Sequence, residues 1–288
     1  MKLKAYCIGN EAHVGIEDGD QIRELKGVAT LVDLMEQLKD IPAIDRRGAI
    51  ESLAGASIAQ KNVTLTAPIV DPVKDLICVG LNYQDHVNES QSLRLSDNKN
   101  DIHTTYFGKR CDFIRGDNAP VTIWSKIDPE MDYEVELAVI IGKSGRSIQR
   151  EDALSHVFGY SIGNDFSARS LQRNHKQWFL GKGADGYTAM GPAVLINEDD
   201  RHHDFDLKCS VNGEVRQKSN TSLMIKSLED IIFEVSQVIS LVPGDIIFTG
   251  TPAGVGGGFM PPKYLKAGDS VTLEIEGIGT LTNQVVAE

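Results

Sequence analysis

The sequence predicts an α+β protein whose larger part is predominantly β. Short apolar runs bounded by glycine, proline, asparagine or aspartate, which are typical of strands, outnumber the segments with helical periodicity. The few helices do not alternate with strands as a doubly wound parallel sheet requires. With 288 residues, 41% of them hydrophobic and 24% charged, the chain is long enough to bury a substantial core.

Residues 1–70 are predicted to form a small N-terminal α/β domain. Short strands joined by hairpin turns are expected in KLKAYCIG, VGIEDG and QIREL. Apolar residues at helical spacing then predict a helix at about 30–39, and a second short helix is expected at 46–54. The segment up to Pro68 and Pro72 is interpreted as a linker.

Residues 71–288 are predicted to form a second, mainly β domain. It begins with the buried strand DLICVGLNY, and a polar loop is expected at 90–103. Asn212-Gly213 is a strong hairpin signal. The other elements expected here are strands at 135–142, 160–165, 192–196 and 207–211, a helix at 227–241 capped by Ser227, and C-terminal strands in DIIFTG, DSVTLEIE and GTLTNQVV.

The composition limits the classes of partner. The net charge of −12 repels nucleic acid and anionic membranes, so neither is expected as a partner. No apolar stretch approaches the length of a membrane span, and the N-terminus lacks the unbroken apolar core of an export signal. The four cysteines are far apart, without a Cys-x-x-Cys pair, which argues against structural zinc and a disulfide framework. The expected location is the cytoplasm.

The first candidate functional element is the segment DYEVELAV. Because alternate side chains of a strand share a face, Glu134 and Glu136 are predicted to point the same way. The apolar residues Val135, Leu137 and Val139 then point into the core. Two adjacent carboxylates repel each other unless a cation or a proton lies between them. The alternative is a solvated strand face.

The second element is GNDFSARSLQ. A strand is expected to end at Asp165, and a helical turn then presents Arg169 and Gln172. The alternative role for Asp165 is that of a helix cap. Together with Glu134 and Glu136, Asp165 forms an oxygen-only set that suits a hard cation. Mg²⁺ or Mn²⁺ is therefore expected rather than zinc.

Three shorter segments add catalytic and binding candidates. In GLNYQDHVNE, His86 and Glu89 are three residues apart and are neighbours if the turn is helical, an arrangement that suits a general base. An ordinary surface pair is the alternative. In FLGKG, Lys182 lies between glycines and either approaches a ligand or is a plain loop cation. In FTGTP, which contains Thr251, backbone N–H groups and hydroxyls are expected to cradle a carboxylate.

Taken together, the motifs GLNYQDHVNE, DYEVELAVIIGK, GNDFSARSLQ, WFLGK and GDIIFTGTPAGVG resemble the fumarylacetoacetate hydrolase family, from about Asp75 to the C-terminus. The resemblance implies a mixed β-roll catalytic domain behind a smaller N-terminal domain, in a homodimer. It also implies a lid that carries His86 and Glu89 and orders over the substrate. The implied metal ligands are Glu134, Glu136 and Asp165.

The resemblance also implies which residues meet the substrate. Lys182 is expected to face the substrate oxygens, and Arg169 and Gln172 to help bind it. Lys109 aligns with a lysine of the family, although its neighbours in YFGKRC differ from those common in the family. Thr251 is a further candidate for substrate binding.

The C-terminal part is similar to a subgroup that includes oxaloacetate decarboxylases and acylpyruvate hydrolases. The implied function is metal-dependent hydrolysis of a C–C bond in a small 2,4-dioxo acid, with release of pyruvate. The alternatives are decarboxylation of oxaloacetate, isomerisation of a 2-hydroxy-dienoate by keto–enol or double-bond shift, and metal-dependent binding without turnover.

Overall fold

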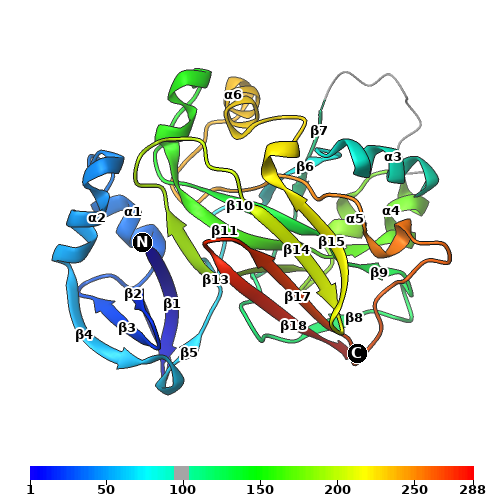
Figure 1. Cartoon of the computed structure of the whole chain (residues 1–288), viewed down its shortest axis with the longest axis horizontal. Helices are drawn as coiled ribbons and strands as arrows, with labels where there is room; N and C mark the ends of the chain where they lie inside the picture. The colour runs from blue at the N-terminus through cyan, green and yellow to red at the C-terminus, as the bar shows by residue number, and fades with distance from the viewer. Residues whose placement is uncertain (94–103) are drawn as a thin grey trace.

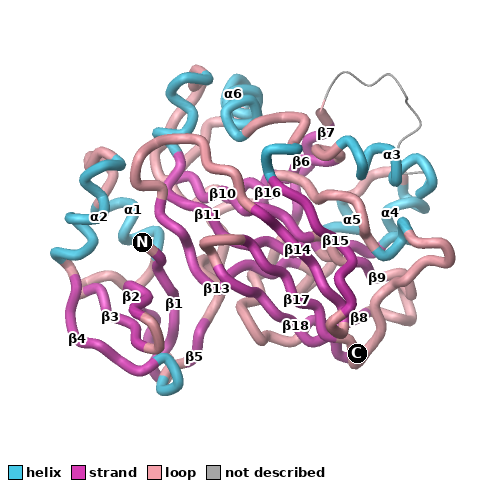
Figure 2. The backbone as a smooth tube through the Cα atoms, in the orientation of Figure 1, coloured by secondary structure: helices cyan, strands magenta, loops and turns pink. Residues whose placement is uncertain are grey.

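The computed structural model describes residues 1–93 and 104–288 and has the predicted α+β architecture (Figure 1). Within those residues, the strands form a main sheet of eleven, a second sheet of five and a ribbon of two. The helices lie at the outside of the sheets (Figure 2). None of the helices in this described part has the length and apolar composition needed to cross a bilayer.

The N-terminal part is an antiparallel meander with two helices beside it, as predicted. Strand β1 also pairs with β13, and apolar residues of both parts form one core, so the sheet and the core continue past residue 70. The division at that residue stays a prediction. The elements are β1 (Lys2–Ile8), β2 (Glu11–Asp18), β3 (Gln21–Leu25), α1 (Leu31–Gln37), α2 (Ala43–Ser52), β4 (Ala54–Ala59), the short 3₁₀ helix η1 (Gln60–Asn62) and β5 (Thr64–Leu65).

The central strands of the main sheet hold the candidate site. From β1 the order continues through β13, β11, β10, β16, β6 and β7. Strands β16 and β6 are parallel, and the other neighbours in this series are antiparallel. Their bounds are β6 (Leu76–Gly80), β7 (Thr105–Lys109), β10 (Val135–Ile141), β11 (Val157–Asp165), β13 (Thr188–Ile196) and β16 (Ile246–Phe248).

The five-stranded sheet packs against one face of these central strands, and helix α6 completes the core between them. Asn212 and Gly213 turn from β14 to β15 with φ of 51° and 82°, which confirms the predicted hairpin. The hydroxyl of Ser227 caps α6 by accepting the N–H of Asp230. The elements are β8 (Val121–Ile123), η2 (Arg150–His156), β14 (Asp206–Val211), β15 (Glu214–Asn220), η3 (Thr221–Leu223), α6 (Leu228–Val238), β17 (Ser270–Ile275) and β18 (Gly279–Ala287).

Strand β10 is buried on both faces. Val135, Leu137 and Val139 lie in the core shared with the smaller sheet, as their alternation predicts. The opposite face carries Glu136 and then Ala138, which belongs to the core shared with the N-terminal part. Both acidic and apolar residues of this strand are therefore removed from water.

Short elements surround the acidic end of β10. One prediction here is wrong: residues 90–93, expected to be loop, continue a helix, while residues 94–103 lie outside the described part of the chain. The polar composition indicated a loop because it lacks an apolar stripe, but the helix is instead anchored by His86 and Ser90, which are buried. These elements are α3 (Gln84–Leu93), β9 (Met131–Asp132), β12 (Ser167–Ala168), α4 (Arg169–His175), α5 (Phe179–Lys182) and η4 (Gly256–Gly258).

Candidate active site

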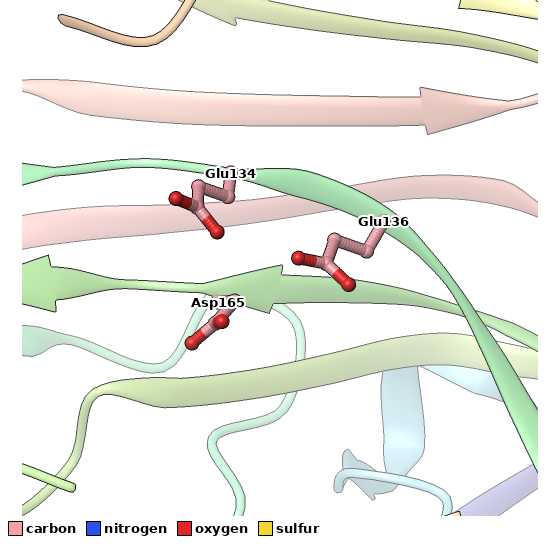
Figure 3. A group of neighbouring side chains, drawn as sticks. All are labelled: Glu134, Glu136 and Asp165. Carbon is pink, nitrogen blue, oxygen red and sulfur yellow. The ribbon is translucent and has the colours of Figure 1, made fainter. Parts of the chain in front are cut away.

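Strand pairing brings three acidic side chains together. The antiparallel pairing of β10 with β11 places Glu134 beside Asp165, whose backbone N–H donates to the Glu134 carbonyl at 3.1 Å. Glu136 lies two residues further along the same face, where Gly163 is its cross-strand partner. One oxygen from each of the three carboxylates lies within 4.8 Å of the others (Figure 3).

This triad is buried, with exposed fractions of 4% for Glu134, 2% for Glu136 and 0% for Asp165. The alternative of a solvated strand face is therefore wrong. The cap reading of Asp165 also fails, because the residue before α4 is Ala168, which makes no side-chain cap. Three buried carboxylates that converge without sulfur or imidazole fit a hard divalent cation such as Mg²⁺ or Mn²⁺.

The three carboxyls differ in their balancing charge. Burial opposes ionisation of Glu134, but Lys182 and Arg169 outweigh it and lower the pKa of this carboxyl to about 2. Burial, together with the negative charges of Asp165 and Glu134, raises the pKa of Glu136 well above its ordinary value. Glu136 is thus the carboxyl of the triad that lacks sufficient positive charge, and a bound cation would supply it.

Two lysines reach the triad from different elements. The Lys182 ammonium, at the end of α5, donates to Glu134 Oε2 and Asp165 Oδ2, both at 2.6 Å. Burial opposes its charge, but these two carboxylates raise its pKa. Lys109, at the end of β7, is fully buried and donates to Asp165 Oδ1 at 2.6 Å and to the carbonyls of Phe166 and Lys182. These three acceptors engage the Lys109 ammonium, so the geometry favours support of Asp165 over the predicted substrate contact.

Arg169 links the triad to a carboxylate behind it. Its Nη2 donates to Glu134 Oε1 at 2.7 Å, its Nε to Asp132 Oδ2 at 2.9 Å, and its Nη1 to Gln172 Oε1 at 3.1 Å. Burial opposes the charge, but Asp132 and Glu134 raise the pKa of this guanidinium. Arg169 and Gln172 both line the cavity beside the triad, and in this arrangement Arg169 holds Glu134 in place.

His86 and Glu89 form the predicted pair on α3. The His86 ring Nδ1 lies 2.9 Å from Glu89 Oε2, and the other oxygen of Glu89 accepts the N–H of Gly254 at 3.0 Å. His86 is only 4% exposed and lines the cavity, so the pair is not an ordinary surface pair. The carboxylate orients the ring and leaves Nε2 free of that contact.

A cavity of about 20 Å³ lies between these groups, enough for about one water molecule. Its ionisable lining residues are Glu134, Glu136, Arg169, Lys182 and His86. Its apolar wall includes Phe107, Trp178 and residues 79–81 at the end of β6. The Trp178 and Phe107 rings make a T-shaped contact, with their centroids 5.0 Å apart. A Cβ added at Gly80 would lie 2.5 Å from the Trp178 indole. Only a residue without a side chain at position 80 leaves room for the Trp178 indole, which completes this wall.

The segment after β16 differs from its prediction. Thr251 lines the cavity, but its hydroxyl donates to the Val135 carbonyl at 2.9 Å and accepts from Gln217 Nε2 at 2.8 Å. The Gly250 N–H donates to Glu136 Oε2 at 2.7 Å. These groups are thus used by the protein itself, to hold β10 and Glu136, and substrate binding by Thr251 stays a prediction.

Sequence reasoning missed residues that support the site. Asp132 is one of them, and its position at the head of DYEVE is the signal that could have identified it. Trp178, directly before FLGK, is another, because it lines the cavity wall. Gln217 accepts the Val135 N–H at 3.1 Å from a strand of the other sheet, and Asn82 bonds the Thr249 carbonyl. Asn82 lies within the motif GLNYQDHVNE, whereas Gln217 belongs to none of the motifs.

Comparison with known proteins agrees with this architecture. The family described as "Fumarylacetoacetate (FAA) hydrolase C-terminal" matches residues 75–286. Oxaloacetate tautomerase YisK of Bacillus subtilis (strain 168) is 44% identical over 241 residues, which cover 82% of this chain and 77% of that protein. The mitochondrial oxaloacetate tautomerase Fahd2a of Rattus norvegicus is 40% identical over 285 residues, covering 96% and 88% of the two chains.

Solved structures extend the similarity to the whole chain. The fumarylacetoacetate hydrolase of Exiguobacterium antarcticum is 35% identical with a TM-score of 0.84 and full coverage of both chains. The 2-hydroxyhepta-2,4-diene-1,7-dioate isomerase of Mycobacterium marinum is 30% identical with a TM-score of 0.78, covering 100% of this chain and 99% of that one. The chain therefore belongs to the fumarylacetoacetate hydrolase family.

Proposed function

We propose that the protein binds Mg²⁺ or Mn²⁺ at Glu134, Glu136 and Asp165 and catalyses keto–enol tautomerisation of a small 2-oxo diacid such as oxaloacetate. The observation that carries this proposal is that His86, oriented by Glu89, lines the same cavity as Glu134, Glu136 and Lys182. The names of the bacterial and mitochondrial relatives support the choice of reaction.

The proposed reaction moves one proton. A bound divalent metal supplies Lewis acidity that favours negative charge on the 2-oxo oxygen. His86 Nε2 removes a proton from C3, and the electron pair of that C–H bond forms the C2=C3 double bond. Lys182 and Gln172 stabilise the oxygen, with roughly 3 kcal/mol for a well-placed donor. A proton then reaches the oxygen, so no atom is gained or lost.

The first test makes three measurements with one purified protein. Oxaloacetate is supplied with Mg²⁺, with and without chelator, while the enol absorbance and the release of pyruvate are recorded. Acetylpyruvate is assayed for pyruvate in parallel. Chelator-sensitive interconversion of keto and enol forms without pyruvate supports the tautomerase. If pyruvate appears from oxaloacetate at the rate of its consumption, the protein is a decarboxylase and the proposal is wrong.

Acylpyruvate hydrolysis is the second candidate. The cavity has room for about one water molecule beside His86, and the Exiguobacterium relative is named as a hydrolase. In this reaction His86 takes a proton from water, the hydroxide adds to the distal carbonyl, and the C–C bond breaks to leave the enolate of pyruvate. Chelator-sensitive release of pyruvate from acetylpyruvate would favour this candidate over tautomerisation.

His86→Ala should slow tautomerisation by about 10²- to 10⁴-fold, because the residue is the proposed general base. The affinity for Mn²⁺, measured by calorimetry, should stay unchanged, since His86 is not a proposed ligand. His175→Ala, a change at an exposed histidine of α4, is the matched control. Wild-type turnover in the His86→Ala protein would remove His86 from the mechanism.

Metal binding should release a proton and become tighter as pH rises. Glu136 has a raised pKa and is protonated at lower pH, so the metal competes with that proton. Calorimetry in buffers of different ionisation enthalpy measures the proton count directly. Glu136→Gln should abolish this release and weaken affinity by at least about tenfold. An affinity independent of pH, with no proton released, would contradict the assignment of Glu136.

Trp178→Ala should widen the cavity, because the indole forms its apolar wall. We expect the ratio of kcat/KM for longer 2-oxo acids to that for oxaloacetate to rise about tenfold, a size effect typical of one or two methylenes. Phe179→Ala is the control, because Phe179 is 55% exposed and does not line the cavity. Equal ratios in both variants would show that the indole does not select substrate size.

A further inference from the structure

We propose that Asp132 is a positioning residue that couples the placement of helix α3 to the placement of Glu134, through the glycine-rich loop Gly254–Gly258. The proposal rests on the metal role proposed above for Glu134. Asp132 lies behind the cavity rather than in its lining, so it acts through other groups and does not touch the substrate.

Asp132 is fully buried and uses both of its oxygens. Oδ1 accepts the N–H of Gly256 at 2.6 Å and of Tyr133 at 2.9 Å. Oδ2 accepts the N–H of Gly257 at 3.0 Å and Arg169 Nε at 2.9 Å. One carboxylate therefore joins the glycine-rich loop to a buried guanidinium. Such charge-assisted bonds are short and strongly directional, so each partner's position depends on the others.

The guanidinium carries this constraint to the proposed metal site. Its Nη2 donates to Glu134 Oε1 at 2.7 Å, so its orientation determines where that carboxylate lies. Asp132 holds the same guanidinium through Nε, and Gln172 holds Nη1. Without the Asp132 charge, Arg169 keeps Glu134 as its one carboxylate partner. It loses the bond from Nε to Asp132 that fixes the plane of the guanidinium. We therefore expect Glu134 to be held less well.

The loop carries the constraint to the proposed base. Its Gly254 N–H donates to Glu89 Oε1 at 3.0 Å, while Glu89 Oε2 lies 2.9 Å from His86 Nδ1. The fit is close on both sides of the loop. A Cβ added at Gly258 would lie 1.9 Å from Glu89 Oε1, and one added at Gly256 would lie 2.7 Å from Asp132 Oδ1. Glycine is thus required where the two carboxylates meet the backbone.

The two ends of this connection can be separated by substitution. Asp132→Asn weakens the hold on both the loop and Arg169, whereas Gly258→Ala displaces Glu89 and leaves the bonds of Asp132 to Arg169 intact. If Asp132 merely stabilised its own strand, neither the metal affinity nor the docking of α3 would respond specifically. Two readouts distinguish these cases: the Kd for Mn²⁺ and amide hydrogen exchange over residues 84–90 in metal-free protein.

For Asp132→Asn we expect Mn²⁺ affinity to fall by at least about tenfold, as for other residues that orient metal ligands, with faster exchange in α3. For Gly258→Ala we expect faster exchange in α3 with the Kd within about twofold of wild type. Turnover should fall in both. Asp245→Asn is a matched control, because Asp245 is also buried and accepts a backbone N–H and a lysine, those of Val242 and Lys74.

Gly48→Ala controls for the glycine change, because nothing lies within 4 Å of a Cβ added there. Both controls should keep the wild-type Kd and exchange. The inference is overturned if folded Asp132→Asn protein keeps both readouts, or changes only one of them. If that variant does not fold, unchanged exchange in Gly258→Ala overturns it instead. If wild-type protein binds no Mn²⁺, the proposed metal role fails, while the exchange data still decide the docking of α3.

Discussion

The carboxylates buried at the start of β10 determine which donors the surrounding structure must supply. Removing a carboxylate from water costs roughly several kcal/mol unless cations and N–H donors surround it. The fold meets this need with donors from four different segments: the end of β7, the start of α4, the end of α5 and the loop after β16. Around this site four buried acids face three buried cations, and Glu136 is the acid that makes no ion pair with any of the three. The groups concerned are Asp132, Glu134, Glu136 and Asp165 against Lys109, Arg169 and Lys182.

Several glycines around the site are required because other groups approach their backbone closely. Gly256 and Gly258 let carboxylates reach the backbone, and Gly80 lets the Trp178 indole close the wall. The resulting cavity is small, with space for about one water molecule. His86 of helix α3 and Trp178, in the turn before α5, both line this cavity. Burial of the charged groups around the cavity lowers the local dielectric constant and strengthens the electrostatic contacts between them.

Hydrolases, isomerases and tautomerases share this fold among the relatives. Both candidate reactions proposed for this chain place negative charge on the 2-oxo oxygen of the substrate. The proposed roles of the carboxylate triad, Lys182 and His86 are the same in both candidates, so these residues do not by themselves distinguish the two reactions. Selection among the reactions therefore depends on the cavity wall and on whether water has a place beside the base.

Much of this protein follows from local sequence. The alternation in DYEVELAV placed Glu134 and Glu136 on one face, the spacing of His86 and Glu89 predicted their contact, and Asn212-Gly213 predicted a hairpin, because each depends only on strand or helix geometry. Tertiary structure alone decided that the acidic face is buried, that Lys109 serves Asp165, and that the donors of the FTGTP segment are already engaged. Those outcomes depend on strand order and register across residues far apart in the chain, and local periodicity carries no information about which distant charge will neutralise a buried one.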